Sequence, residues 1–453
     1  MEAFVSRAIE ELAGSGAGLV AITVPAPLVP IDRAARAPLG SPLLFWDAPA
    51  EGRGPSTAVV GFGESARVEG SGEGRFDEIR GGAAEVFARL TERRHPDASF
   101  APPARLFGGV AFRPEPARAA PWSAFRDASF ALPRWLYGTD GERAFLRLTA
   151  RREEIVGPQT IVEALASIES ARGPLPNGAA LEADLTRTSP EVWGEMIGDA
   201  LSRIRAEELT KVVPMALCKV ETRGRLDPAT ALGNVAALYP ECARFAFQRG
   251  DAVFLGASPE RLVQKVGLAV EADALAGSAP RRVAGDARAA AALLESDKDR
   301  REHRFVVDAI EGALAPLSRE MTVPGAPVVR TLRNVHHLWT PIGATLARPM
   351  HVLDLVRLLH PTPAVCGTPR EAAIRWIAAH EPATRGWYAG AVGHFDAAGD
   401  GAFSVAIRSG LLAGGEAWLY AGAGIVEGSD ATMEYAETRT KQAPMLAALG
   451  LVP

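Results

Sequence analysis

The stretch LYAGAGIVEGSD (residues 419–430), followed by ATMEYAETRTK (431–441), decides how the C-terminal part of the chain folds. An apolar run and a glycine-rich turn come first, and they predict a buried strand that leads directly into a helix. In that helix Glu434, Glu437 and Lys441 lie at i, i+3 and i+7 and therefore share one face. A solvated charged face is the common interpretation of such spacing. Here the buried strand brings the helix into the body of the protein, so we expect this face to point inward.

A second helix with an inward carboxylate is predicted for KDRREHRFVVDAIEGAL (298–314). Its apolar stripe is formed by Val306, Ile310 and Leu314, and Glu302 lies one turn before this stripe. A carboxylate in line with a buried face points inward and needs a cation or hydrogen-bond donors. Pairing with an arginine is one interpretation. The other is a Mg²⁺ site shared with the glutamates of the C-terminal helix, because this ion takes few protein carboxylates and leaves positions for water or an anionic substrate.

Short apolar runs bounded by Gly and Pro predict strands along the rest of the chain. These strands are expected at 19–24, 42–46, 58–63, 106–112, 135–138, 144–150, 211–220, 244–248, 253–257, 261–266, 268–275, 388–395, 402–409 and 418–426. Helices are expected at the N-terminus, over 81–94 and after the N-cap Ser189, with a linker over 171–180. We therefore predict an α+β fold that forms one large body. Its N-terminal part (1–185) has few chemical motifs, and its C-terminal part (186–453) is dense in them.

The composition excludes several classes of function. The chain has 49 basic and 54 acidic residues, a net charge of −5, and so lacks the basic footprint of a nucleic-acid-binding protein. Its three cysteines show no C-x-x-C spacing, which argues for a reducing compartment. The N-terminus resembles an amphipathic helix more than a signal peptide, and no apolar run approaches the roughly 18 residues that span a membrane. We expect a cytoplasmic protein without membrane contact.

Lysine is rare, with five residues against 44 arginines, so each lysine position stands out. A lysine can be made neutral by burial and then act as a base, which arginine cannot do. Lys211 opens a predicted strand and is the first candidate. Glu260 follows a strand and a Ser-Pro turn, a position that fits either a general acid or the start of a helix. Arg408 and Tyr388 are candidates for clamping a carboxylate, because guanidinium offers a bidentate fork. A structural ion pair is the alternative for Arg408.

Two glycine-containing runs, AGSAPRR (276–282) and AGAG (421–424), allow the backbone to approach another group closely. Their N–H groups fit either binding of a carboxylate or tight turns. His337 and His360 stand alone in their surroundings. Isolated histidines are more often buried structural residues than catalysts.

Taken in order, the runs KVV, GASPERLV, ALAGSAPR, KDRREH, LHPTPAVCGTP, RGWYAGAVG, VAIRS and AGAGIVEGSD…EYAETRTK resemble the chorismate-utilising enzymes. This family includes isochorismate synthases, salicylate synthases, anthranilate synthase component I and aminodeoxychorismate synthases. The resemblance covers roughly residues 190–450. It implies a large α+β domain of two packed antiparallel β-sheets with helices outside, and a site for chorismate in the cleft between the sheets.

The resemblance also implies roles for particular residues. Glu302 and Glu437 match the family's Mg²⁺ ligands, with Glu434 beside the metal. Lys211 matches the lysine that water-adding members use as a base, and Glu260 matches the general acid that protonates the leaving C4 hydroxyl. The positions that match substrate-binding or pocket-lining residues are Ser278, His337, Ala364, Tyr388, Ile407, Arg408, Gly422 and Lys441.

A few positions distinguish the branches of the family. Ala276 stands where aminodeoxychorismate synthases carry a nucleophilic lysine, and Ala364 and Ile407 match isochorismate synthases. We therefore expect an isochorismate synthase that acts as a monomer without an amidotransferase subunit. A salicylate synthase and a non-catalytic chorismate-binding protein are the alternatives. The sequence leaves open whether the product serves menaquinone, siderophore or other biosynthesis.

Two departures from the family pattern are visible. The family often has KVVLAR where this chain has KVVPMA, so Pro214 enters the expected strand and Ala216 replaces a common arginine. A proline there removes a donor from the sheet and indicates an edge or a bulge. Tyr435 stands where tryptophan is common. These departures affect local geometry and leave the acid, base and metal positions intact.

Overall fold

A computed structural model describes residues 1–13, 18–40, 42–49, 57–115, 120–155, 157–171, 182–281 and 285–451. The helices are α1 Glu2–Ala13, α2 Ile31–Ala34, α3 Arg75–Ala88, α4 Gln159–Ser170, α5 Pro190–Arg205, α6 Pro228–Leu238, α7 Asp286–Glu295, α8 Asp297–Leu314, α9 Val352–Leu359, α10 Arg370–His380 and α11 Ala431–Ala448. The strands are β1 Leu19–Ala26, β2 Pro42–Asp47, β3 Ala58–Gly70, β4 Leu90–Arg94, β5 Arg105–Val110, β6 Ala128–Thr139, β7 Ala144–Arg151, β8 Ala183–Arg187, β9 Lys211–Val212, β10 Met215–Thr222, β11 Ala243–Arg249, β12 Ala252–Ser258, β13 Arg261–Val266, β14 Ala269–Pro280, β15 Ser318–Thr322, β16 Val328–Thr331, β17 Val335–Leu346, β18 Gly367–Thr368, β19 Ala391–Asp396, β20 Gly401–Val405, β21 Ser409–Ala413 and β22 Glu416–Gly422.

Twenty of these strands form one hydrogen-bonded network, and the pairs are antiparallel except for β1 with β4. The network divides at β6, which pairs with β3 along one edge and with β5 and β7 along the other. The first arm runs β3–β2–β11–β12–β21–β22–β10–β8, and the second runs β5–β19–β20–β13–β14–β17. The predicted α+β fold is confirmed. Its two sheets are the two arms of a single network, because the long β3–β6 pair joins them.

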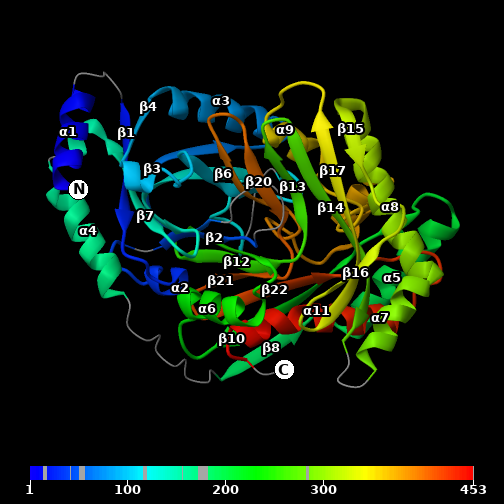
Figure 1. The fold of residues 1–453 in the computed structure, drawn as a ribbon. Coiled ribbons are helices and arrows are strands. Elements are labelled where there is room, and N and C mark those ends of the chain that lie inside the picture. Colours follow the sequence, from blue (N-terminus) through cyan, green and yellow to red (C-terminus); the bar gives the residue numbers. More distant parts are fainter. Residues whose placement is uncertain are drawn as a thin grey trace.

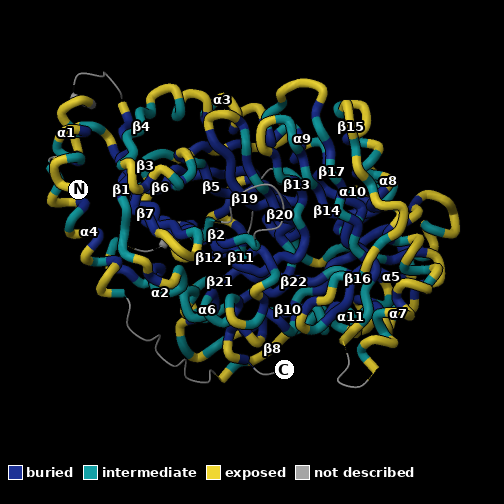
Figure 2. The backbone as a smooth tube through the Cα atoms, in the orientation of Figure 1, coloured by how far each residue is buried: buried dark blue, intermediate teal, exposed yellow. Residues whose placement is uncertain are grey.

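The two arms enclose a common hydrophobic core. Phe245 and Phe254 of the first arm and Val263 and Phe403 of the second belong to one cluster of buried side chains. Helices lie around the strands, with α1 and α4 at one end and α5, α7 and α8 at the other (Figure 1). Buried backbone is concentrated in the strands, whereas the outer turns of the helices are exposed (Figure 2). Burial of large apolar side chains between the arms is the main stabilising contribution to such a fold.

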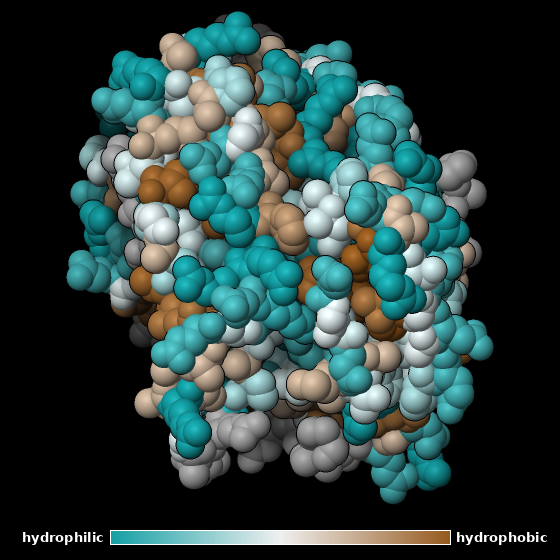
Figure 3. Space-filling view, turned by 90° about the vertical axis from the view of Figure 1, so that its right-hand side faces the viewer, coloured by the Kyte–Doolittle hydropathy of each residue, from teal (hydrophilic) through white to brown (hydrophobic). Residues whose placement is uncertain are grey.

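The N-terminal part belongs to the same network as the C-terminal part. β2 pairs with β11, and β5 pairs with β19, so strands from both sides of residue 185 are hydrogen-bonded to each other in both arms. On the face seen in Figure 3, hydrophobic residues lie in several separate groups between hydrophilic ones. Among the residues that the structure describes, no helix has both the length and the apolar character needed to cross a membrane.

The predicted N-cap Ser189 is confirmed, and the structure adds Asp430 as the N-cap of α11. The side chain of Ser189 accepts a hydrogen bond from the N–H of Val192 at the start of α5, and that of Asp430 accepts one from Met433 at the start of α11. Such caps satisfy N–H groups that the helix itself leaves without partners. Most of the predicted linker, residues 172–180, lies outside the described part of the chain.

The bounds predicted for the helix over 81–94 are wrong at both ends. α3 begins at Arg75 and ends at Ala88, and LTERR forms β4, which pairs in parallel with β1. A tertiary strand partner therefore overrides the local preference for helix.

The strands predicted over 211–220 and 402–409 are each interrupted. Pro214 separates β9 from β10, and Arg408 lies between β20 and β21 with a φ of 53°.

Candidate active site

A pocket of about 650 Å³, open to solvent, lies between the two arms. The second arm contributes the Leu275–Ser278 segment of β14 and His337 of β17, and the first arm contributes Tyr420–Gly422 of β22. Glu260 comes from the turn between β12 and β13, which joins the two arms. The remaining lining residues come from helices α8 and α11 and from loops, and are Val213, Glu302, Ala364, Val365, Tyr388, Ile407, Arg408, Gly424, Glu437 and Lys441. The structure thus brings eleven of the thirteen predicted site residues to one pocket.

The two predicted residues that do not line the pocket are Lys211 and Glu434. Lys211 is fully buried in β9, and its Nζ donates to Oε1 of the pocket-lining Glu302 at 2.8 Å. Gly424 makes this approach possible, because a Cβ added there would lie 2.2 Å from Oε1 of Glu302. The inward glutamate predicted for the second helix is therefore present, and its cation is a lysine instead of an arginine.

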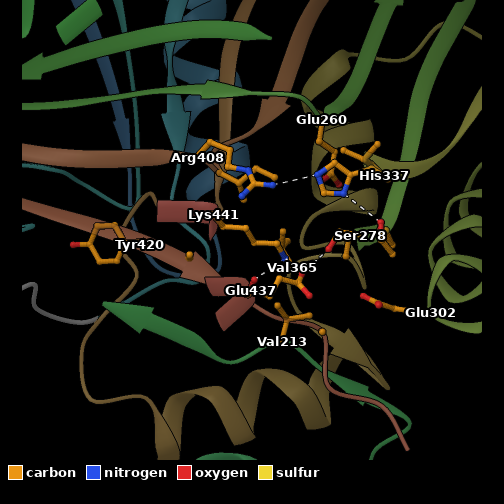
Figure 4. Close-up of a pocket in the computed structure, with 18 of the residues that line it drawn as sticks. Val213, Glu260, Ser278, Glu302, His337, Val365, Arg408, Tyr420, Glu437 and Lys441 are labelled. Carbon is orange, nitrogen blue, oxygen red and sulfur yellow. Dashed lines mark hydrogen bonds and ion pairs between the residues drawn. The ribbon is translucent and has the colours of Figure 1, made fainter. Parts of the chain in front are cut away.

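The inward face of α11 is also confirmed by its contacts. Oε1 of Glu437 accepts hydrogen bonds from the hydroxyl of Ser278 and from Nζ of Lys441, both at 2.6 Å (Figure 4). Lys441 also donates to the carbonyl oxygen of Gly422 at 2.9 Å. Burial alone would raise the pKa of Glu437, but Lys441 and Ser278 outweigh it and lower that pKa to about 2. Glu437 is therefore an anion across the physiological range.

Glu434 lies one turn before Glu437 and is buried. Its Oε1 accepts a hydrogen bond from Nζ of Lys298 at 2.7 Å. Burial raises the pKa of Glu434, and the negative charge of Glu437 adds to this. Glu302, Glu434 and Glu437 thus each face a different lysine. Within the described ranges, no three His, Cys, Asp or Glu side chains are grouped in a way that holds a metal ion.

Glu260 has the environment of a carboxyl that stays protonated near neutral pH. It lies between β12 and β13, is 2% exposed, and its Oε1 has no hydrogen-bond partner among the residues that the structure describes. Burial and the negative charge of Asp273 raise its pKa to about 8, against the opposite effect of Lys211 and Lys441. A carboxyl of this kind can donate a proton into the pocket.

Arg408 and His337 form one side of the pocket (Figure 4). Nη2 of Arg408 donates to Nε2 of His337 at 3.2 Å, and Nδ1 of His337 lies 3.3 Å from the carbonyl oxygen of Gly277. Because Nε2 accepts from a guanidinium, Nδ1 carries the proton and the ring is neutral. Burial and the positive charge of Arg408 together lower the pKa of His337 to about 3, in agreement with this arrangement. Nη1 of Arg408 is buried and, in the described part of the chain, has no hydrogen-bond partner.

Tyr388 completes this side of the pocket. Its ring stacks on that of Tyr420, with the centroids 5.1 Å apart. Burial raises the pKa of Tyr388 to about 12, so its hydroxyl remains a donor. Together with Arg408 and Lys441 it supplies donors suited to an anionic ligand. His360 lies outside the pocket, where its Nε2 contacts the carbonyl oxygen of Phe112 at 3.3 Å, so it has the structural role expected of an isolated histidine.

Sequence reasoning missed several residues of the pocket. Gly424 was recognised only as part of a glycine run, and nothing local indicates that it faces Glu302. Val213, Leu275 and Val365 are apolar wall residues without a chemical signature. Tyr420, at the end of the apolar run, carried no signal either, although Figure 4 shows it across the pocket from Glu302.

The fold and the pocket are those of a protein that takes a small anionic molecule, because the cationic side chains of Arg408 and Lys441 line the pocket beside the buried carboxyl of Glu260. The chain belongs to the chorismate binding enzyme family, whose sequence profile matches residues 17–450.

Individual relatives agree with this assignment. The salicylate biosynthesis isochorismate synthase of Pseudomonas aeruginosa is 37% identical over 91% of this chain and 86% of its own length. The isochorismate synthase MenF of Bacillus subtilis is 34% identical over 76% of this chain and 74% of its own length. Among solved structures, the menaquinone-specific isochorismate synthase MenF of Escherichia coli matches with a TM-score of 0.77 and 27% identity, and the match covers 98% of this chain and 99% of that one.

Proposed function

We propose that this protein is an isochorismate synthase, which converts chorismate reversibly to isochorismate. Water adds at C2 of chorismate, the ring double bonds shift, and the C4 hydroxyl leaves as water. Glu260 is the acid that protonates the leaving hydroxyl, and Lys211 is the base that takes a proton from the attacking water. The names of the relatives support this reaction, since several are isochorismate synthases.

The observation that carries the proposal is the state of Glu260. A fully buried carboxyl with a pKa of about 8 is protonated at neutral pH, and no described residue forms a hydrogen bond with its Oε1. Acid catalysis needs a proton donor whose pKa lies near the working pH. A protein that only binds chorismate has no need for a protonated, unpartnered carboxyl at the pocket, so this feature favours an enzyme over a binding protein.

The proposed base, Lys211, is not in the charge state that the reaction needs. Lys211 forms an ion pair with Glu302, whereas a base must be neutral when it receives the proton. The proposal therefore requires the Lys211–Glu302 pair to open during the catalytic cycle. The position of Lys211 supports this role, because the lysine is fully buried directly behind the pocket-lining Glu302.

Substrate carboxylates have suitable partners in the pocket. Chorismate is a dianion, and the buried Nη1 of Arg408 offers a donor that has no hydrogen bond to any residue that the structure describes. The hydroxyl of Tyr388 and the ammonium of Lys441 add two more donors. Buried donors without partners are costly, so binding a carboxylate there removes a penalty that the free protein carries.

Mg²⁺ is the cofactor that we propose, with Glu302 and Glu437 as ligands and Glu434 beside it. The donor set fits this ion, because Mg²⁺ prefers carboxylate oxygens and uses only one or two from the protein. Each of these carboxylates faces a lysine, so Mg²⁺ would compete with Lys211 and Lys441 for them. When bound, the ion would neutralise negative charge and help to anchor a substrate carboxylate.

The test is incubation of the purified protein with chorismate and Mg²⁺, followed by chromatographic separation of the products. We expect isochorismate from the unmodified chain and at least a ~10²-fold lower rate from Glu260→Gln. Glu271→Gln is the matched control, because Glu271 is half-buried on the neighbouring strand β14 and does not line the pocket. Unchanged turnover in Glu260→Gln would contradict the proposed acid, and chorismate binding without any product would favour the binding protein.

A further inference from the structure

Trp122, from the N-terminal part of the chain, is connected to the pocket through Tyr420. Trp122 is fully buried in the segment between β5 and β6, and its Nε1 donates to the hydroxyl of Tyr420 at 3.0 Å. The centroids of the two rings lie 5.9 Å apart. Tyr420 in turn lines the pocket and stacks on Tyr388. A residue distant in sequence from every predicted site residue therefore touches the wall of the pocket.

The same indole ring also holds the backbone that precedes Tyr388. Gly386 has a φ of 53°, and a Cβ added to it would lie 2.1 Å from Cδ2 of Trp122, so the backbone lies directly against the ring. The neighbouring Trp387 is fixed by the same segment, because its Nε1 donates to the carbonyl oxygen of Arg126 at 2.8 Å. The backbone of residues 386–387 thus packs against the segment that carries Trp122.

Tyr388 is accordingly held from two directions. Its backbone is fixed by the contacts of Gly386 and Trp387, and its ring is fixed by Tyr420, whose own direction depends on Trp122. The phenol oxygen of Tyr388 lies close to Gly422, where an added Cβ would be 3.4 Å from it. A tyrosine held at both ends loses little rotational freedom when it binds a ligand, and such preorganisation strengthens binding.

We propose that Trp122 and Tyr420 are positioning residues for the substrate, which act by holding the hydroxyl of Tyr388 in its binding direction. This inference rests on the proposed function only for the identity of the substrate. Loss of the Trp122–Tyr420 hydrogen bond frees the ring of Tyr420 and, with it, the ring of Tyr388. Binding of chorismate then weakens, while Glu260 and Lys211 keep their places and the chemical step is little changed.

The experiment compares Tyr420→Phe, Trp122→Phe and the double variant with Tyr137→Phe. Tyr137 is a fully buried tyrosine whose hydroxyl also makes hydrogen bonds, to the backbone of Val29, but it lies in the other core cluster, away from the pocket. Free energies of unfolding, kcat, KM and the Kd for chorismate by calorimetry are measured for each. Loss of one buried hydrogen bond is expected to raise KM and Kd roughly three- to tenfold in Tyr420→Phe, with a smaller change in kcat.

Tyr137→Phe should lose stability to a similar extent and keep the KM of the unmodified protein. The Kd of the double variant should be no higher than the higher of the two single-variant Kd values, because both substitutions remove the same Trp122–Tyr420 hydrogen bond. An unchanged Kd in Tyr420→Phe, or an equal rise in Tyr137→Phe, overturns the inference. If the unmodified protein binds chorismate but releases no isochorismate, the proposed function fails, and the Kd values alone decide the inference. Failure to bind chorismate at all overturns both.

Discussion

The amino group of Lys211 lies 2.8 Å from Oε1 of Glu302, and the lysine is fully buried whereas the glutamate lines the pocket. Removing one partner of a buried ion pair leaves the other charge uncompensated. The pair also joins the proposed base to a proposed metal ligand. A change to either partner of the Lys211–Glu302 pair should therefore affect the stability of the fold, metal binding and catalysis together.

Replacing Lys211 by Ala should lower kcat at least ~10²-fold, because a general base is lost. Chorismate binding should be affected less than turnover. Lys265→Ala is the control, since Lys265 is also a buried lysine, paired with Asp400 outside the pocket. Both changes should destabilise the fold by about 3–5 kcal/mol, as expected for broken buried pairs. If both variants lost turnover equally, Lys211 would be a structural cation.

The pH dependence of kcat/KM should report Glu260. Its pKa of about 8 means that the carboxyl is protonated below that pH and loses its proton above it. Because the acid must be protonated in the direction from chorismate to isochorismate, the rate should fall as pH rises through about 8. Steady-state rates between pH 6 and 10, at fixed ionic strength and Mg²⁺, test this expectation. A profile that stays flat above pH 9 would exclude Glu260 as the proton donor.

Gly424→Ala should disturb the site by crowding. The new Cβ would lie 2.2 Å from Oε1 of Glu302, so this carboxylate must move. We expect a loss of stability of about 1–3 kcal/mol from overpacking and a loss of activity of roughly 10²-fold from misplacement of Glu302. Gly343→Ala on β17 is the control, because the nearest atom to its added Cβ is 3.9 Å away. Full activity of Gly424→Ala would show that the position of Glu302 is unimportant.

Activity should depend strictly on Mg²⁺. Treatment with a chelator should abolish turnover, and added Mg²⁺ should restore it, because the proposed ligands hold the ion only through carboxylate oxygens. Glu302→Gln and Glu437→Gln should remain inactive at any Mg²⁺ concentration while unfolding cooperatively. Glu311→Gln, on the same helix as Glu302 but not lining the pocket, should behave like the unmodified protein. Undiminished turnover without divalent metal would show that Mg²⁺ is not required for the reaction.

The sequence was most informative where local patterns and chemistry coincide. The apolar stripe of the second helix correctly placed Glu302 inward, and the strand–turn–helix unit correctly turned Glu437 and Lys441 toward the pocket. Both predictions depended on helical periodicity, which is a local property of the chain. The N-cap Ser189 could also be predicted locally, from a serine followed by a proline at the first helical position.

Long-range relationships were beyond sequence reasoning. Pairing of Glu302 with Lys211, and not with an arginine, depends on the distance between β9 and α8 in the folded chain. The left-handed backbone of Arg408, which interrupts the predicted strand over 402–409, has no local signature, since non-glycine residues rarely adopt it. The contact of Trp122 with Tyr420 joins residues 298 positions apart. Only the tertiary structure brings such residues together.

The identity of the released product tests the central proposal most directly. Ala364 and Ile407 both line the pocket, and we propose that these side chains influence whether isochorismate goes on to lose its side chain as pyruvate. Chromatography of a reaction with chorismate and Mg²⁺ at neutral pH, with parallel assays of pyruvate and salicylate, makes the measurement. The account predicts that isochorismate is released in equilibrium with chorismate and that little pyruvate forms. Equal amounts of pyruvate and salicylate, produced by this protein alone, would contradict it.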